Sequence, residues 1–219
     1  MRFKKTVTVI LVVVGFVVFA AGALMFYGVT QTYRFRVPTG AMMNTIVPGD
    51  YVLATKVRGD LRRGQIVTFR YPDDESTYFV ARIIGLPNET IDVRGTSVYI
   101  DNRPLEEEKV MIQVDDAEMM NELKELSTEG TGPYRVFYDV AQDRTSEEQE
   151  TATDMAAFPF QIPAGGYYLM GDNRDNSMDS RYRGPVPREL IYGQAQFIYY
   201  SVRMDRDEVR WNRFYKKLH

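Results

Sequence analysis

An uncharged apolar run from about Val7 to Tyr27 constrains this chain more than any other feature of its sequence. At a helical rise of about 1.5 Å per residue, roughly 20 residues of helix cross a hydrocarbon core about 30 Å thick. We therefore expect one transmembrane helix over residues 6–28. A cleavable signal peptide is the alternative, because Ala20-Ala21-Gly22-Ala23 resembles a cleavage site. The apolar core of a signal peptide is only about 7 to 15 residues long, and this run is longer.

The residues before the apolar run carry positive charge at Arg2, Lys4 and Lys5. Positive side chains beside a membrane helix favour the cytoplasmic side of the bilayer. We therefore expect residues 1–5 to form a cytoplasmic tail and everything after the helix to be extracytoplasmic. The lipid bilayer is then one expected partner.

Two absences narrow the chemistry that this chain can perform. It has no cysteine, and its single histidine, His219, is the last of its 219 residues. These absences exclude a cysteine nucleophile, a Ser-His-Asp triad, a zinc site of the His/Cys type and a disulfide framework. The formal net charge of -3 gives no field that would favour nucleic acid. We expect no nucleic-acid partner, no metal and no other cofactor.

Short strand-like segments dominate the chain from Arg34 onward. They are rich in Val, Ile, Tyr and Phe, and Gly, Pro, Asp and Asn separate them. The strongest candidates are Tyr51–Ala54, Gln65–Phe69, Thr77–Ile84, Ser97–Ile100, Tyr167–Met170 and Gln196–Tyr200. No long amphipathic helix interrupts them. The pattern predicts a mainly β fold, a barrel-like antiparallel sheet domain with an inserted smaller lobe.

The inserted lobe is predicted from a change of composition after the turn Asp101–Pro104. Residues from about Leu105 to Thr153 are rich in charge, with a short predicted helix at Ala117–Leu126 and an acidic run at Glu147–Glu150. Such a run is typical of a solvated face. We therefore expect a β domain in two parts, 29–104 and 158–219, around a lobe or loop at 105–157.

Two segments contain the residue types of a functional site. Pro38-Thr39-Gly40-Ala41-Met42 leads into the first predicted strand, and taken alone it is better explained as a linker and turn before a strand. The stretch from Gly171 to Pro187 places many short polar and charged side chains after an apolar strand. Such a loop requires dense hydrogen bonding. A calcium loop would need regularly spaced oxygen ligands and a closing Glu, which are missing, so we expect a network that supports a site.

The residues of this loop resemble the Gly-Asp-Asn-Arg-Asp-Asn-Ser-x-Asp-Ser-Arg box of bacterial type I signal peptidases. Pro38–Met42 resembles the nucleophile box of that family, Pro-Ser/Thr-Gly-Ser-Met, and Val80–Pro87 resembles its Lys-Arg-x-x-Gly-Leu-Pro box. The boxes occur in the family's order. The resemblance implies an endopeptidase of the bacterial inner (plasma) membrane, with its catalytic domain outside the cytoplasm. It would remove signal peptides from secreted preproteins after small-x-small sequences.

The resemblance also implies a role for individual residues. In this family a serine hydroxyl attacks the peptide carbonyl, and a desolvated lysine amine accepts the proton. Those positions are Ala41 and Ala81 in this chain, and the oxyanion hole would use the hydroxyl of Thr39 and the N–H of Ala41. Supporting roles fall on Ser177, Asp179, Arg181 and Arg82, and substrate-binding roles on Arg36, Val37, Pro38, Tyr78, Phe79 and Val80. Arg183 stands where the family more often has tryptophan.

The two alanines imply that this chain does not cut its substrate. A methyl group can neither attack a carbonyl nor accept a proton, whereas the supporting residues of the boxes are kept. Because drift would also remove supporting residues, the pattern favours a deliberately inactivated peptidase. The alternatives are a natural non-catalytic preprotein-binding pseudoenzyme or scaffold on the membrane face, and a membrane-tethered β domain with another partner.

Overall fold

The computed structural model describes residues 13–23, 27–28, 30–43, 45–71, 73–112, 134–139 and 158–218. The chain divides into two compact units, Met1–Tyr33 and Arg34–His219. In the first unit, residues 13–23 are helical. Among the described residues, no helix combines the length and the apolar character needed to cross a membrane. The predicted tail at 1–5 and part of the predicted membrane helix at 6–28 lie outside the described residues.

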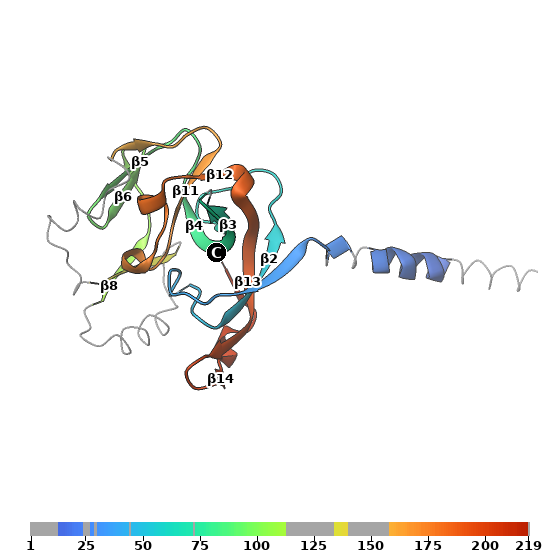
Figure 1. Ribbon diagram of the computed structural model, residues 1–219. Helices are drawn as coiled ribbons and strands as arrows, with labels where there is room; N and C mark the ends of the chain where they lie inside the picture. Colours follow the sequence, from blue (N-terminus) through green and yellow to red (C-terminus); the bar gives the residue numbers. More distant parts are fainter. Residues whose placement is uncertain are drawn as a thin grey trace, which may run out of the picture. The chain divides into compact units, whose positions relative to one another are not determined.

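Antiparallel strands form most of the second unit (Figure 1). The larger sheet has the strand order β1-β2-β13-β3-β4-β11-β12, and β14 and β15 pair with β13. Its strands are β1 Thr32–Arg36, β2 Asp50–Lys56, β3 Ile66–Tyr71, β4 Asp74–Gly85, β11 Gly166–Met170, β12 Val186–Pro187, β13 Ile191–Arg203, β14 Glu208–Val209 and β15 Lys216–Lys217. The prediction of a mainly β, antiparallel domain is confirmed.

The described residues also form two smaller sheets. One has the order β10-β5-β6-β7 and consists of Phe160–Gln161, Thr90–Arg94, Ser97–Ile100 and Arg103–Pro104. The other is a parallel pair of β8 (Glu108–Ile112) and β9 (Arg135–Asp139) within the predicted inserted lobe. In the four-stranded sheet, β5, β6 and β7 precede that lobe in the sequence and β10 follows it. The predicted boundaries at 105 and 157 do not indicate this pairing. The predicted helix at Ala117–Leu126 and the acidic run lie outside the described residues.

The core of the larger sheet lies on both of its faces, as strand β3 illustrates. Successive side chains of a strand point to opposite faces. Val67 and Phe69 pack with Ile83 in one buried cluster, whereas Ile66 packs with Ile198 in another. β13 pairs with both β2 and β3, and its register shifts at three places. Such bulges bend a strand, so β13 curves the sheet around its core.

The loop between β1 and β2 carries the first of the two predicted site segments, and a glycine turn fixes its end. Gly49 has φ +93°, and a Cβ there would lie 2.0 Å from the carbonyl oxygen of Val202. Only glycine fits such a backbone conformation and so close an approach. Arg213 then holds the loop, since its Nη2 lies 2.6 Å from Asp50 Oδ2 and 3.1 Å from the carbonyl oxygen of Thr45. The β1–β2 loop is therefore anchored where it enters strand β2.

Candidate active site

A groove of about 500 Å³ brings the two predicted site segments together. It is lined by residues of the β1–β2 loop, of strands β3 and β4, and of the loop that follows β11. Both Ala41 and Ala81 line it, together with Thr39 and Ser177. The predicted substrate-binding residues also line it: Arg36, Val37, Pro38, Tyr78, Phe79 and Val80. Residues more than 130 positions apart in the sequence thus line the same cleft.

The loop after β11 holds the backbone of the Ala41 segment. The backbone N–H of Asn173 donates to the carbonyl oxygen of Ala41 at 3.1 Å, and Asn173 Nδ2 donates to the carbonyl oxygen of Gly40 at 2.9 Å. Gly171 lies so close that a Cβ there would be 2.5 Å from the Ala41 carbonyl oxygen and 2.3 Å from Ser177 Oγ. The absence of a side chain at residue 171 therefore lets the two segments touch.

Replacing Gly171 by alanine should open this contact. The added methyl group would overlap a backbone oxygen, so we expect Gly171→Ala to cost about 1–3 kcal/mol of unfolding free energy. Chemical denaturation would measure the loss, and hydrogen exchange would show a less protected Asn173 amide. Gly166→Ala is the control, because it lies at the other end of β11 and a Cβ there meets its nearest atom at 3.3 Å. Equal losses in the two variants would contradict the close contact.

Asp179 and Arg181 form the ion pair expected beside the groove. Arg181 Nε and Nη2 each lie 2.8 Å from a carboxylate oxygen of Asp179. Asp179 also accepts hydrogen bonds from the backbone N–H of Gly171 at 2.9 Å and of Arg181 at 3.2 Å. Burial, with the nearby Asp179 carboxylate, raises the pKa of Tyr71 and of Tyr168 well above the ordinary tyrosine value. Both phenols therefore stay neutral beside the pair.

Arg82 lies behind the groove and does not line it. It follows Ala81 on β4, and the alternation of the strand turns its side chain to the opposite face. There its Nε and Nη2 donate to Asp172 Oδ1 and Oδ2 at 2.8 and 2.7 Å, with both side chains 1% exposed. Its Nη1 donates to the carbonyl oxygen of Gly64 at 2.6 Å, and the hydroxyl of Thr45 contacts Asp172. Arg82 thus ties β4 to the loop that supports the site.

Arg183 lies against two aromatic rings at the position where the family more often has tryptophan. Its guanidinium carbon is 4.9 Å from the ring centroid of Tyr71 and 5.4 Å from that of Phe79. A guanidinium over a ring is attracted by the ring's negative face. Arg183 therefore packs as a flat cation against the aromatic residues beside the groove.

Sequence reasoning did not single out three residues that hold the site together. Asp172 is the partner of Arg82, Asn173 binds the Ala41 segment, and Glu107 forms a buried ion pair with Arg174 at 2.5 Å. Asp172 and Asn173 stood within the recognised box, so their polarity next to a buried strand was an available signal. Glu107 lies 67 positions from Arg174, and no local pattern connects the two.

The described lining of the groove contains no nucleophile paired with a basic side chain. Its described lining includes hydroxyl groups, among them Thr39 and Ser177, but neither lysine nor histidine. Its one buried carboxylate, Asp179, is held by Arg181. Among the described residues, no three Asp, Glu, His or Cys side chains are placed to hold a metal ion.

Comparisons with known proteins identify the family of this chain. The family model described as signal peptidase, peptidase S26, matches residues 5–200. Signal peptidase I of Rickettsia canadensis (strain McKiel) is 33% identical over 196 residues, which cover 78% of this chain and 72% of the relative. Signal peptidase I of Buchnera aphidicola subsp. Acyrthosiphon pisum (strain APS) is 27% identical over 223 residues, covering 81% of this chain and 70% of the relative.

A crystal structure of a signal peptidase I from Enterococcus faecalis V583 is also similar, with 25% identity and a TM-score of 0.37. That match covers 63% of this chain and 98% of the other. The fold assignment is based on the strands described above and not on this similarity. The family model, in contrast, spans nearly the whole chain, and this chain therefore belongs to the signal peptidase family, peptidase S26.

Proposed function

We propose that this protein carries the substrate groove of a type I signal peptidase and binds signal peptides there without cutting them. The active enzymes of this type are membrane-bound serine/lysine endopeptidases. They remove signal peptides from secreted preproteins by cleaving after small-x-small sequences. One observation carries the proposal: Ala41 and Ala81, the positions of the nucleophile and the base, line the same groove with Thr39 and Ser177. The groove is kept, and the two reactive groups are missing.

Strand β4 offers the peptide a place to bind. Its pairing with β11 ends at Met170↔Arg82, whereas β4 itself continues to Asp74. Residues 78–80 therefore face the groove at a stretch of β4 that β11 does not cover. An extended peptide can add to such an edge as a further strand. Apolar lining residues such as Val37 and Phe79 would then accept small side chains one and three positions before the cleavage site.

The groove also retains the groups that would polarise the scissile carbonyl. The backbone N–H of Ala41 and the hydroxyl of Thr39 are the proposed oxyanion donors. In an active enzyme, a serine oxygen at position 41 would bond to the carbonyl carbon, and a lysine amine at position 81 would take its proton. Here a methyl group occupies each place. We therefore infer peptide binding and carbonyl polarisation with no acyl-enzyme.

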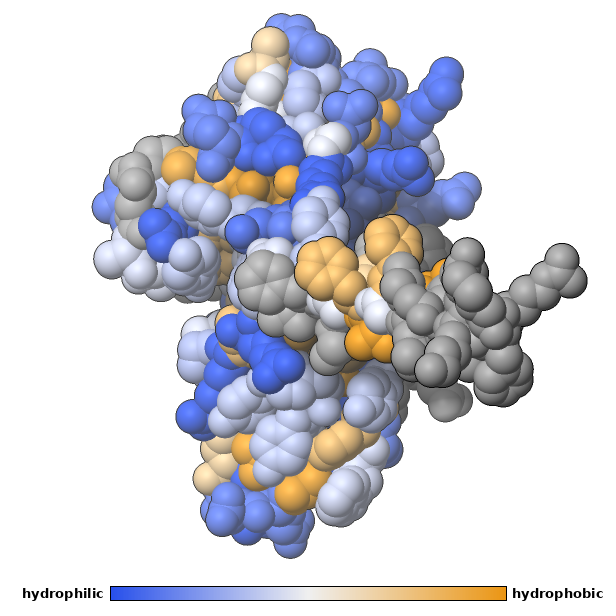
Figure 2. Space-filling model, turned by 90° about the vertical axis from the view of Figure 1, so that its right-hand side faces the viewer, coloured by the Kyte–Doolittle hydropathy of each residue, from blue (hydrophilic) through white to orange (hydrophobic). Residues whose placement is uncertain are grey.

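We further propose that the protein acts at the bacterial inner membrane with its groove outside the cytoplasm. The apolar run at 7–27 and the basic residues before it support this placement. Figure 2 shows hydrophobic residues interspersed with hydrophilic ones over the end of the second unit that carries β14. Trp211 and Tyr215 near that end are 74% and 77% exposed. Aromatic side chains of this kind are favoured at the interface between a bilayer and water.

A binding experiment with a labelled signal peptide tests the proposal. The full chain in detergent should bind a peptide with a small-x-small sequence, and mass spectrometry should find the peptide intact after prolonged incubation. A peptide with tryptophan at the two small positions should bind at least about tenfold more weakly, because each lost pocket contact costs roughly 1–3 kcal/mol. Equal binding of both peptides would contradict the groove assignment, and cleavage by this chain would contradict its inactivity.

A natural origin of Ala41 and Ala81 would make the chain a preprotein-binding protein or scaffold on the membrane face. The same groove serves both functions, since the supporting pair Asp179–Arg181 is intact in either case. The codons for positions 41 and 81 in the native gene distinguish this alternative from a deliberately inactivated peptidase.

A further inference from the structure

The inserted lobe contacts the loop that supports the groove. Strand β9 of the lobe lies against that loop: the backbone N–H of Phe137 donates to the carbonyl oxygen of Asp172 at 2.8 Å, and Phe137 forms a β-bridge with Asn173. The backbone N–H of Asp139 donates to Asp175 Oδ2 at 2.5 Å. The segment Gly171–Ser177, here called the support loop, is thus paired with the lobe on one side.

A fully buried ion pair joins the lobe to the support loop at its centre. Arg174 Nη1 and Nη2 lie 2.8 and 2.5 Å from the two carboxylate oxygens of Glu107, and both side chains are 0% exposed. Arg174 Nη1 also donates to the hydroxyl of Tyr138 at 3.0 Å, which in turn donates to the carbonyl oxygen of Thr96 at 3.0 Å. Because Glu107 comes from the lobe and Arg174 from the support loop, the pair fixes one against the other.

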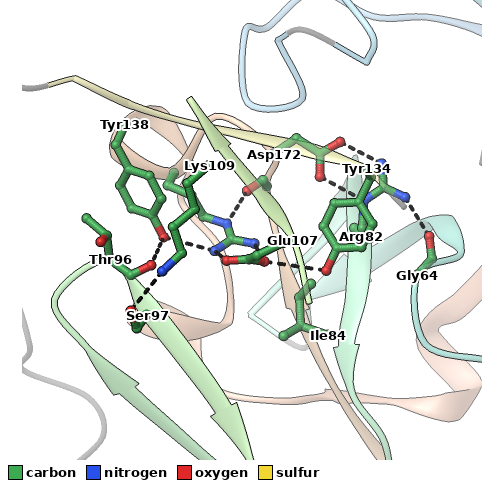
Figure 3. Close-up of polar contacts among 12 residues, drawn as sticks. Gly64, Arg82, Ile84, Thr96, Ser97, Glu107, Lys109, Tyr134, Tyr138 and Asp172 are labelled. Atoms are coloured by element: carbon green, nitrogen blue, oxygen red, sulfur yellow. Dashed lines mark hydrogen bonds and ion pairs between the residues drawn. The ribbon is translucent and has the colours of Figure 1, made fainter. Parts of the chain in front are cut away.

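A second contact of Glu107 reaches the Arg82–Asp172 pair. Figure 3 shows Glu107, Tyr134, Arg82 and Asp172 side by side, with Tyr134 between the two ion pairs. The hydroxyl of Tyr134 lies 3.4 Å from Glu107 Oε2, and the guanidinium carbon of Arg82 lies 4.1 Å from the centre of the Tyr134 ring. The lobe therefore contacts both arginines that stand behind the groove.

The other side of the support loop faces the groove itself. Asn173, the neighbour of Arg174, donates to the carbonyl oxygens of Ala41 and Gly40. The carbonyl oxygen of Arg174 accepts a hydrogen bond from Arg181 Nη2 at 2.6 Å, and Arg181 holds Asp179 in the groove wall. A displacement of Arg174 would thus move groups on two sides of the groove.

From this arrangement we infer that Glu107 is a positioning residue for the peptide groove, because its ion pair with Arg174 holds the support loop against Gly40 and Ala41. The inference rests on the proposed function for the identity of the ligand. A buried guanidinium is strongly destabilised when its carboxylate partner is removed. Without Glu107, Arg174 would have to move toward water, and Asn173 would move with it.

The neighbouring residue provides a matched control. Glu108, the next residue, begins strand β8 and pairs across to Arg135 of β9 at 2.9 Å. Its side chain and that of Arg135 are 30% and 20% exposed, so water partly solvates this ion pair. Glu107→Gln and Glu108→Gln therefore remove the same charge from adjacent residues, but only the first removes the buried ion pair with Arg174.

The test measures amide exchange and peptide binding on the full chain. Glu107→Gln should speed exchange in residues 171–177 by at least about tenfold, while β2 and β3 keep their protection. Breaking a buried ion pair costs more free energy than the amount that makes local opening of the loop tenfold more frequent. It should also weaken binding of the small-x-small peptide by at least about tenfold, and Glu107→Asp should restore part of both effects. Glu108→Gln should change either value by less than about twofold.

Unchanged exchange in residues 171–177 of Glu107→Gln would overturn the inference, and so would faster exchange spread equally over β2 and β3. If Glu107→Gln does not fold, Tyr138→Phe takes its place, because it removes the hydroxyl between Arg174 and Thr96 and keeps the ring. This variant should also speed exchange selectively in residues 171–177, and no selective change would overturn the inference. Failure of the parent chain to bind peptide would contradict the proposed function alone, because the exchange measurement needs no ligand.

Discussion

Placing serine at position 41 and lysine at position 81 should give a protein that cleaves signal peptides at least about 10³-fold faster than the chain itself. The double variant Ala41→Ser/Ala81→Lys supplies the two groups that the groove lacks. Ala81 is 2% exposed, so a lysine there would be removed from water, which favours its neutral and basic form. Ser177 lines the same groove as Ala81, and we expect its hydroxyl to orient that amine.

The two single variants are the controls for this prediction. A serine without a base is a weak nucleophile, and a lysine without a nucleophile has no proton to accept. Ala41→Ser and Ala81→Lys alone should therefore stay close to the background rate. Chromatography of a peptide with one small-x-small site measures all four proteins. A double variant that binds the peptide but leaves it intact would refute the roles given to positions 41 and 81, and cleavage by Ala41→Ser alone would refute the role of position 81.

Six strands, five of the larger sheet and one of the four-stranded sheet, could be predicted because their apolar pattern is local. The six predicted strands correspond to β2, β3, β4, β6, β11 and β13. The prediction for β13 was too short, since Gly193 and Gln194 interrupt its apolar pattern although both pair with neighbouring strands. The parallel pair β8–β9 joins residues 27 positions apart, such as Glu108 and Arg135, and leaves no hairpin signal.

The candidate site shows a similar division between local and distant features. The three boxes were recognisable as runs of residues, and residues of each line one groove in the structure. Recognition did not reveal what holds them in place. Glu107 and Tyr138 are ordinary residues of a charged segment and a strand, and their importance comes only from their contact with Arg174. Polar partners far apart in sequence follow no period, so only a structure can identify them.

The Arg82–Asp172 pair should be among the most costly polar interactions to break in this protein. Both side chains are 1% exposed, and two charged hydrogen bonds of 2.8 and 2.7 Å join them. Removing one partner leaves a buried charge without compensation, which costs about 3–5 kcal/mol. We therefore expect Asp172→Asn to lose this much unfolding free energy. At about 2–4 °C per kcal/mol for a domain of this size, the melting temperature should fall by roughly 6–20 °C.

A surface pair separates this effect from the general loss of a carboxylate. Asp73 lies 3.5 Å from Arg183, and their side chains are 69% and 30% exposed. Water already solvates both groups there, so Asp73→Asn should change stability by less than about 1 kcal/mol. Calorimetry on the three proteins gives the comparison. If Asp172→Asn melted within a degree or two of Asp73→Asn, the arginine behind the groove would not depend on its carboxylate, and Asp172 would not anchor β4 to the support loop.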